Sequence, residues 1–420
     1  MEKLVVKGKK KLSGVIKISG SKNATLPILA ASILNKNKIV IGRVPVVKDV
    51  ITMVELLRHI GSNIKFDLKK NKILINNRKR KLKTIAPYKL LKTMRAGVIV
   101  LGPLLSKFRK AKVSLPGGCA IGSRPVDIHL FVLKKLGAKI KIKNGYIFAE
   151  AKKGLEGKKI RLPSISVGAT ENALIAASYA KGTTILSNCA CEPEIKDLIT
   201  FLKKMGIKIK SISNRKIKIS GNQNLKPVNH NVMFDRIEAG TFIIAGALVS
   251  NRLKIIGVDS KILKKEIFIL KKMGVRIIIK KHDITVLSSK KIKPISINTE
   301  PYPGFPTDLQ AQIMVLMTKA NGVSKIKENI FEKRFMHVPE LNRMGAKIKI
   351  LKDTSFIYGP QQLNGAEVMA TDLRASVSLV LAGLSAKDKT IINRVYHLDR
   401  GYEKLETKLR KCSANIFRKN

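Results

Sequence analysis

The fold is decided by a stretch that reads Leu133-Lys134-Lys135-Leu136-Gly137-Ala138-Lys139-Ile140-Lys141-Ile142. Its first half has the apolar spacing of a helix end, and its second half alternates apolar and lysine residues with the period of a strand. A helix that must stop and turn into a strand commonly takes a left-handed residue, which glycine adopts without steric cost. The stretch therefore predicts a helix, a left-handed glycine and a strand.

This block recurs along the whole chain. We use the residue between the helix pattern and the strand pattern as the marker of each copy. The markers are 68 to 76 residues apart and are Gly61, Gly137, Gly206, Gly274, Gly345 and, in a degenerate sixth copy, Ser413. Upstream of each marker lies another short strand pattern and, where it can be read, an apolar helix. Each copy reads β-α-β-α-β-β, and six copies account for the 420 residues. Two lobes of three copies each are the simplest grouping, with the polar stretch 224–231 between them.

Charge is the most unusual feature of the composition. The chain has 83 Lys+Arg against 28 Asp+Glu, a formal net charge of +55. Such an excess first suggests nucleic acid. However, the lysines are spread evenly, and in 139–143 and 207–210 they alternate with isoleucines. That alternation predicts isoleucines on the core face and lysines in water, and a coding bias toward AT-rich codons is the better explanation of the excess.

Several classes of protein are excluded. The longest apolar stretches reach about ten residues, whereas a membrane span needs about 20. The N-terminal segment lacks the apolar core of a signal peptide, and four cysteines are too few for a disulfide scaffold. No Ser-His-Asp arrangement, metal-ligand cluster or dinucleotide fingerprint is visible. We expect a cytoplasmic globular protein that needs no metal and no cofactor.

Two segments are candidates for chemistry. Ser114-Leu115-Pro116-Gly117-Gly118-Cys119 runs on through Gly122 and Arg124, which predicts an exposed, mobile loop. Cys119 is either a reactive thiol, since a neighbouring cation favours thiolate, or an ordinary loop cysteine. Lys22 follows a strand pattern and precedes an apolar helix, where a helix start makes a natural anion site. With 83 basic residues present, Lys22 alone is weak support.

Longer blocks carry a family resemblance. They are Gly20-Ser21-Lys22-Asn23-Ala24, the Pro-Gly-Gly-Cys loop, Asp235-Arg236-Ile237-Glu238, residues 305–312, residues 334–341, residues 370–376 and residues 396–402. Together and in this order they resemble the UDP-N-acetylglucosamine 1-carboxyvinyltransferases, which are enolpyruvyl transferases of peptidoglycan synthesis. The resemblance covers essentially the full chain.

The resemblance implies an α/β fold of two inverse α/β barrels, each built from three β-α-β-α-β-β units. Residues 21–232 would form the first lobe, which carries the mobile cysteine loop. Residues 1–20 and 233–420 would form the second lobe, with the active site in the cleft between the two. The implied reaction transfers the enolpyruvyl group of phosphoenolpyruvate to the 3-hydroxyl of UDP-N-acetylglucosamine and releases phosphate.

The resemblance also implies roles for particular residues. Cys119 would protonate the methylene carbon of phosphoenolpyruvate as general acid, and Asp308 would act as general base on the sugar hydroxyl. The expected phosphoenolpyruvate-binding residues are Lys22, Asn23, Arg124 and Arg400. The expected UDP-sugar-binding residues are Arg95, Arg124, Pro125, Val126, Asp127, Ile128, Ser164, Ile165, Ser166, Val167, Asp308 and Ile330. Asp372 and Arg374 would line the opposing lobe.

The departures from the family pattern are few. Ser164 stands where some relatives have a lysine, and Cys412-Ser413 replaces the apolar-glycine step in the sixth copy. Two competing functions remain open at this point. One is the related 3-phosphoshikimate enolpyruvyl transferase, and the other is a nucleic-acid-binding protein on a degenerated enzyme scaffold. The first-named reaction implies small-molecule partners, no specific nucleic acid and no membrane.

Overall fold

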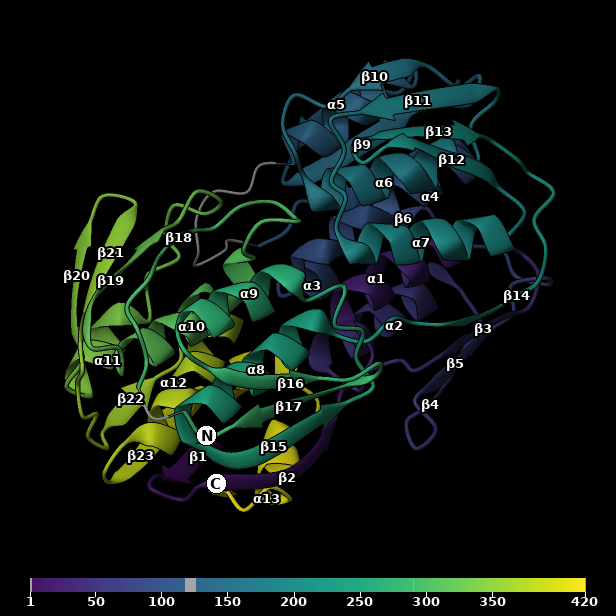
Figure 1. The fold of residues 1–420 in the computed structure, drawn as a ribbon. Helices are drawn as coiled ribbons and strands as arrows, with labels where there is room; N and C mark the ends of the chain where they lie inside the picture. The colour runs from purple at the N-terminus through teal and green to yellow at the C-terminus, as the bar shows by residue number, and fades with distance from the viewer. Residues whose placement is uncertain (1, 118–125, 290, 420) are drawn as a thin grey trace. The chain divides into compact units, whose positions relative to one another are not determined.

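The computed structural model describes residues 2–117, 126–289 and 291–419. These fall into two compact units (Figure 1). Residues 20–117 and 126–233 form what we call the middle unit, and residues 2–19 with the described residues from 234 onward form the terminal unit. Each unit has its own hydrophobic core.

Six four-stranded sheets share one order: a strand, a parallel neighbour and then two antiparallel strands. In the middle unit the sheets are β14 (Val228–Asn231), β3 (Ile39–Gly42), β5 (Lys72–Ile75) and β4 (Ile64–Asp67); β6 (Ile85–Ala86), β7 (Lys110–Ser114), β9 (Tyr146–Glu150) and β8 (Lys139–Lys143); and β10 (Lys159–Arg161), β11 (Thr183–Ser187), β13 (Lys216–Ser220) and β12 (Lys208–Ser213). In the terminal unit they are β2 (Leu12–Lys17), β15 (Ser250–Ile256), β17 (Asp283–Leu287) and β16 (Arg276–Ile279); β18 (Ser296–Asn298), β19 (Gly322–Lys327), β21 (Thr354–Gly359) and β20 (Lys347–Leu351); and β22 (Glu367–Met369), β23 (Lys389–Asn393), β1 (Lys3–Lys7) and β24 (Asn415–Lys419).

Helices connect the strands in the predicted β-α-β-α-β-β order, as in β10-α6-β11-α7-β12-β13. The helices of the middle unit are α1 (Lys22–Ala31), η1 (Ser32–Leu34), α2 (Lys48–Ile60), α3 (Tyr88–Leu91), η2 (Arg95–Val100), α4 (Leu101–Phe108), α5 (Asp127–Lys135), α6 (Val167–Ala177) and α7 (Pro193–Lys204). Those of the terminal unit are α8 (Arg236–Val249), α9 (Lys264–Lys272), η3 (Thr307–Leu309), α10 (Gln310–Met317), α11 (Val338–Arg343), α12 (Leu373–Ser385), η4 (Val395–Arg400) and α13 (Leu405–Arg410).

Three of the sheets include a strand from a distant part of the chain, and in one of them β2 pairs with β15. The first sheet of the middle unit takes its leading strand from β14, at the end of that unit. The sixth sheet takes β1, from the start of the chain, between β23 and β24. In the sixth copy, β24 follows the marker Ser413 and β1 supplies the other antiparallel strand.

The inner helices are apolar on all sides. In the terminal unit α8, α10 and α12 pack on one another, and almost all of their residues are buried. A helix that is hydrophobic all round belongs in an interior, with the sheets outside it. The mixed α/β architecture predicted from the sequence is thereby confirmed.

The left-handed markers are also confirmed. The backbone φ angle is positive at all six, from 71° at Ser413 to 108° at Gly61. Ser413 is the one non-glycine residue among them, so it carries the steric strain that the five glycines avoid.

The prediction for the alternating lysine–isoleucine runs is only partly right. Ile207, just before β12, and Ile209, within β12, are buried as expected. In β8, however, Ile142 is 55% exposed, and Ile140 is half-buried. β8 and β12 are both edge strands, but Ile142 lies next to the hairpin turn at 144–145, whereas Ile209 lies near the start of its strand. Strand periodicity fixes which side of the sheet a residue faces, and the length of the covering layer decides whether that side is buried.

Candidate functional site

Lys22 forms a buried ion pair in the middle unit. Lys22 is the first residue of α1, whose N-cap Ser21 accepts a hydrogen bond from the amide of Ala24 at 3.3 Å. Lys22 Nζ lies 3.1 Å from Asp49 Oδ2, and the two residues are 9% and 5% exposed. Asp49 sits in the first turn of α2, where the helix dipole stabilises a carboxylate. The carboxylate of Asp49 therefore holds the Lys22 ammonium group in one position within the folded unit.

Asn23 follows Lys22 in the first turn of α1 and is half-buried. The predicted phosphoenolpyruvate pair thus lies at the positive end of a ten-residue helix. Backbone amides and a fixed lysine at such an end favour an anion.

His129 marks the place where three predicted UDP-sugar segments come together. Burial, with the charge of Arg95 nearby, lowers the pKa of His129 to about 4. The amide nitrogen Nδ2 of Asn172, on α6, lies 3.1 Å from His129 Nδ1, so the neutral ring accepts there. A Cβ built on Gly168, at the start of α6, would lie 3.2 Å from His129 Cε1.

The segments around His129 are helix starts. α5 begins at Asp127, which is exposed, between buried Val126 and half-buried Ile128. α6 begins at Val167 and is capped by the Ser166 hydroxyl, which accepts from Ala169 N at 3.3 Å. The turn before the cap contains Ser164, which is exposed, and Ile165, which is half-buried. α5 packs against α6, and η2, which starts at Arg95, packs against α6 as well.

In the terminal unit two arginines hold the carboxylate of Asp308. Arg334 Nη2 lies 2.8 Å from Oδ1, and Arg374 Nη2 lies 2.7 Å from Oδ2. The arginine side chains are 4% and 7% exposed, whereas that of Asp308 is 28% exposed. Burial disfavours the charged guanidinium of Arg374, but the Asp308 carboxylate outweighs it, and the pKa of Arg374 is raised. The carboxylate is oriented on both sides and still reaches the surface of the unit.

A buried network of hydroxyl groups supports the arginine clamp, by which we mean Arg334 and Arg374 around the Asp308 carboxylate. Arg374 Nη1 donates to the hydroxyl of Tyr402 at 3.3 Å, and that hydroxyl lies 2.9 Å from Thr241 Oγ1. Gln312 Nε2 donates to both hydroxyls and to the backbone carbonyl of Asp308 at 2.9 Å. Burial raises the pKa of Tyr402, which keeps its hydroxyl neutral.

Ile330, Asp372 and Arg400 complete the described site residues of this unit. The amide of half-buried Ile330 donates to Glu328 Oε1 at 2.9 Å. Asp372 caps α12, because its Oδ1 accepts from Arg374 N at 2.7 Å. Burial and the charge of Arg400 lower the pKa of His397, while Asp372 opposes that shift. Asp372 and Arg400 therefore both lie near this histidine.

Three predicted residues, Cys119, Arg124 and Pro125, lie outside the described residues. Sequence reasoning gave no role to four residues that the structure places in these groups: Asp49, Glu328, Arg334 and Tyr402. Arg334 and Tyr402 stood in short polar clusters of the sequence. No sequence motif points to Asp49 or Glu328, because the role of each depends on a hydrogen-bond partner more than twenty residues away.

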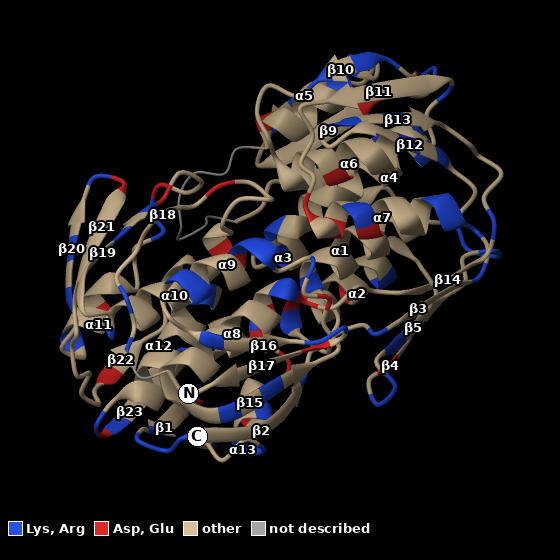
Figure 2. Cartoon of the chain, in the orientation of Figure 1, with Lys and Arg blue, Asp and Glu red and all other residues tan. Residues whose placement is uncertain are grey.

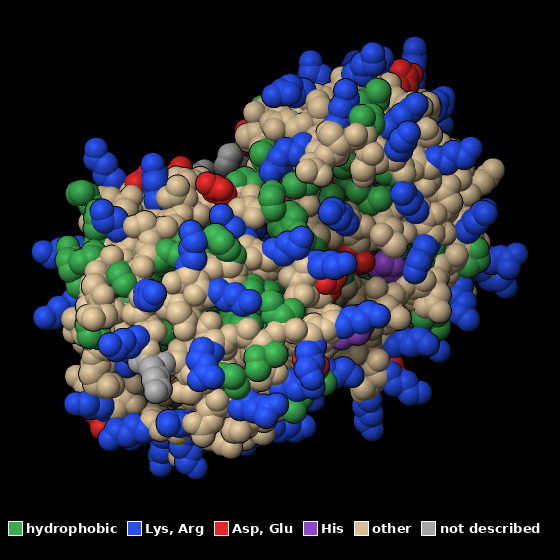
Figure 3. All heavy atoms as spheres, viewed as in Figure 1, with side chains coloured by type: hydrophobic (Ala, Val, Ile, Leu, Met, Phe, Trp, Pro, Cys, Tyr) green, Lys and Arg blue, Asp and Glu red, His purple; other side chains and the backbone are tan. Residues whose placement is uncertain are grey.

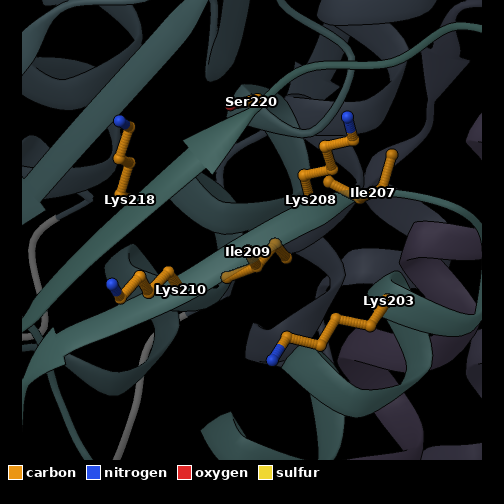
Figure 4. Close-up of a pocket in the computed structure, with 7 residues that line it drawn as sticks. All are labelled: Lys203, Ile207, Lys208, Ile209, Lys210, Lys218 and Ser220. Atoms are coloured by element: carbon orange, nitrogen blue, oxygen red, sulfur yellow. The ribbon is translucent and has the colours of Figure 1, made fainter.

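The charge is spread over the surface rather than gathered at these groups. Lysine and arginine are scattered along both units (Figure 2) and over the visible face (Figure 3). An open pocket of about 410 Å³ on the middle unit (Figure 4) is lined by Lys203, Ile207, Lys208, Ile209, Lys210, Lys218 and Ser220. None of these is a predicted site residue. No helix in the described part of the chain is both long and apolar enough to cross a membrane. No group of three or more potential metal ligands is found among the described residues.

Comparisons with known proteins give consistent matches. The model of the family described as EPSP synthase (3-phosphoshikimate 1-carboxyvinyltransferase) matches residues 6–409. The chain is 60% identical to the UDP-N-acetylglucosamine 1-carboxyvinyltransferase of Pelagibacter ubique (strain HTCC1062) and 50% identical to that of Rickettsia prowazekii (strain Madrid E), over 100% of each chain.

Solved structures resemble the whole chain. The enolpyruvyl transferase NikO from Streptomyces tendae matches with a TM-score of 0.91 at 25% identity, over 100% of this chain and 99% of that one. An EPSP synthase from Acinetobacter baumannii matches with a TM-score of 0.75 at 18% identity, over 100% of both chains, and this second likeness concerns the fold alone.

Proposed function

Since this chain belongs to the enolpyruvyl transferase family that the EPSP synthase model describes, we propose that it is a transferase acting on UDP-N-acetylglucosamine. It transfers the enolpyruvyl group of phosphoenolpyruvate to the 3-hydroxyl of the sugar and releases phosphate, in the first committed step of peptidoglycan precursor synthesis. The observation that carries this assignment is the 60% identity, over the full length, to a relative named for that activity.

The competing assignment is 3-phosphoshikimate as the acceptor, because the family model carries that name. It is disfavoured by the difference in identity, since the EPSP synthase among the solved structures shares only 18% of its residues with this chain.

For phosphoenolpyruvate we propose a site of convergent cations made by Lys22, Asn23, Arg124 and Arg400. Both substrates are polyanions, so fixed positive groups are needed to offset their repulsion and to hold them in register. The Lys22–Asp49 pair supports this role. A lysine that is oriented and largely desolvated by a partner interacts with a phosphate more strongly than a flexible surface lysine.

For the UDP-sugar we propose the segments around His129 together with Asp308 and Ile330. In the middle unit these segments are Arg95, residues 124–128 and residues 164–167. Support comes from their gathering at the starts of α5 and α6, where backbone amides suit a diphosphate. Asp372 and Arg374 are proposed to act on the substrates from the terminal unit.

The proposed chemistry balances in two steps, an addition and an elimination. Cys119 donates a proton to the methylene carbon of phosphoenolpyruvate while the sugar 3-oxygen bonds to the neighbouring carbon and Asp308 takes the hydroxyl proton. Loss of phosphate then restores the double bond, while one proton of the same methyl group returns to the Cys119 thiolate and the proton held by Asp308 leaves with the phosphate. Asp308 suits its part because the arginine clamp orients it while leaving its side chain 28% exposed.

The proposed reaction also implies the binding partners and the cellular compartment of the protein. Phosphoenolpyruvate and UDP-N-acetylglucosamine are its proposed small-molecule partners, and the cytoplasm is its proposed compartment. Specific nucleic-acid binding is not part of the proposal, because the lysines are scattered. A gel shift that survives about 0.2 M salt would contradict this point, since purely electrostatic binding weakens steeply there.

The test is phosphate release from phosphoenolpyruvate, measured separately with UDP-N-acetylglucosamine and with shikimate 3-phosphate. We expect release only with the UDP-sugar, and loss of that release after thiol alkylation. Release only with shikimate 3-phosphate would overturn the assignment.

Alkylation can be directed to Cys119. Cys189 and Cys412 are buried and Cys191 is half-buried, and burial raises the pKa of each of these thiols. Thiolates are the reactive form, so these three react slowly. A Cys191→Ser variant controls for the most accessible of them and should be inactivated as fast as the unmodified protein.

A further inference from the structure

Glu328 joins the two segments of the terminal unit that carry Asp308 and Ile330. We infer that Glu328 is a positioning residue for the UDP-sugar, an inference that rests on the proposed function. It holds the turn before Asp308 and the turn at Ile330 at a fixed separation, so that both meet the same sugar.

Each carboxylate oxygen of Glu328 holds one segment. Oε2 accepts a hydrogen bond from the hydroxyl of Thr307, the first residue of η3, at 2.9 Å. Oε1 accepts from the backbone amides of Ile330 at 2.9 Å and Phe331 at 3.1 Å. Glu328 is 5% exposed. A single buried side chain thus bridges the residue before Asp308 and the residue at Ile330.

The backbone that carries Glu328 is itself anchored. Its amide donates to the carbonyl of Asp353 at 2.8 Å. The amide of Asn329, the next residue, donates to the hydroxyl of Thr299 at 2.9 Å, and Thr299 is fully buried. The bridge therefore starts from a fixed point of the sheet rather than from a free loop.

A carboxylate suits this role better than a neutral group. Hydrogen bonds to an ionised acceptor are shorter and stronger than neutral ones, and a carboxylate offers two oxygens that point in different directions. A buried charge is unfavourable unless its bonds are made. Three donors within 3.1 Å satisfy that requirement here.

The hydrogen bonds of Glu328 also limit which backbone groups at Ile330 can bind a ligand. The amides of Ile330 and Phe331 are both committed to Glu328. The other polar backbone group of Ile330 is its carbonyl oxygen, which accepts hydrogen bonds only. Asp308 is likewise an acceptor. The pair therefore fits the donor groups of an amino sugar, namely a hydroxyl and an N-acetyl N–H.

The experiment compares the KM for each substrate in four single variants of the full chain. Glu328→Ala removes both arms of the bridge, and Glu328→Gln keeps an oxygen for the two amides and an amide group that can donate to Thr307. Thr307→Val removes one arm alone. Asn342→Ala is the matched control, because Asn342 also bonds backbone groups, at Ile348, but lies on α11 of the same unit.

In Glu328→Ala we expect the KM for UDP-N-acetylglucosamine to rise about 10- to 100-fold, with less than about a threefold change in the KM for phosphoenolpyruvate, because misplacement of contact groups weakens binding at one site. Glu328→Gln should recover most of the loss, and Thr307→Val should lie between the two. Asn342→Ala should lower the thermal midpoint without changing either KM.

Two outcomes overturn the inference in distinguishable ways. If the unmodified protein releases phosphate with the UDP-sugar and Glu328→Ala is less stable but has unchanged KM values, Glu328 is merely structural. The same conclusion follows if both KM values rise equally. If the unmodified protein does not use the UDP-sugar at all, the proposed function fails and the inference fails with it.

Discussion

The left-handed residue after α13 permits a paired test of backbone strain. Ser413 and Gly345 occupy equivalent positions, because each follows a helix and each amide donates to the carbonyl three residues before it, at 3.0 and 2.9 Å. The following residue is an alanine in both turns, and its amide donates to a carbonyl five residues earlier. The φ angles are 71° and 92°. We predict that Ser413→Gly stabilises the protein and that Gly345→Ser destabilises it.

The magnitude follows from two opposing terms. An L-residue in the left-handed region is disfavoured by about 1–2 kcal/mol relative to glycine. Glycine, however, gains about 0.4–1 kcal/mol of entropy in the unfolded chain. The difference favours glycine by about 0.5–1 kcal/mol. Crowding adds little at Gly345, where a new Cβ would approach no closer than 3.6 Å, to Asn364 Nδ2.

The assay is urea unfolding of the two single variants and of the double variant. The midpoint should rise in Ser413→Gly, fall in Gly345→Ser and return close to that of the unmodified protein when both changes are combined, provided that the sites are independent. A lower midpoint in Ser413→Gly would refute the reasoning, since the serine would then stabilise the turn by a contact that outweighs its strain.

Three further predictions concern the candidate site and its surroundings. Cys119→Ser should lose nearly all turnover, about 10²-fold or more, because a hydroxyl is a far weaker acid than a thiol; a rate like that of the unmodified protein would remove Cys119 from the mechanism. Asp308→Asn should lower kcat by about 10²–10⁴-fold, as expected for loss of a general base, in a pre-steady-state assay that separates chemistry from binding; an unchanged kcat would leave Asp308 a binding residue only. Burial and nearby Arg95 lower the pKa of His129 from 6.5 to about 4, so between these pH values the unfolded protein binds a proton at His129 and the folded protein does not. The free energy of unfolding should therefore fall by about 3 kcal/mol as the pH drops from about 6.5 to about 4. His129→Gln should flatten that part of the stability–pH profile, and an unaltered profile would show that His129 does not titrate as argued.

The repeat architecture was predictable because its signal is local. A glycine after a helix and before an alternating strand is read within ten residues, and the six positive φ angles confirm it, Ser413 included. Burial at the ends of edge strands was not predictable. Ile142 has the same alternation as Ile209, yet one is exposed and the other buried, because the covering helix layer is not encoded in the strand itself.

The candidate site was predictable only as a set of separate residues. The resemblance named Lys22 and Asp308, but their partners Asp49 and Arg334 had to be found in the folded chain. Among 83 basic residues, sequence alone does not show which one meets a given carboxylate 26 positions away. Glu328 shows the same limit, since its role is defined by the three groups that it joins.

The closure of the sixth sheet has a consequence for synthesis on the ribosome. The middle unit uses a nearly continuous stretch of chain, so all of its sheets are available once residue 233 has emerged. In the terminal unit β1 lies between β23 and β24, with Lys3 opposite Lys419. Until β23 and β24 have been synthesised, both edges of β1 lack their hydrogen-bond partners. Unpaired strand edges can associate with other chains. The strand begins and ends with a lysine, Lys3 and Lys7, and charged residues on an exposed edge disfavour such association.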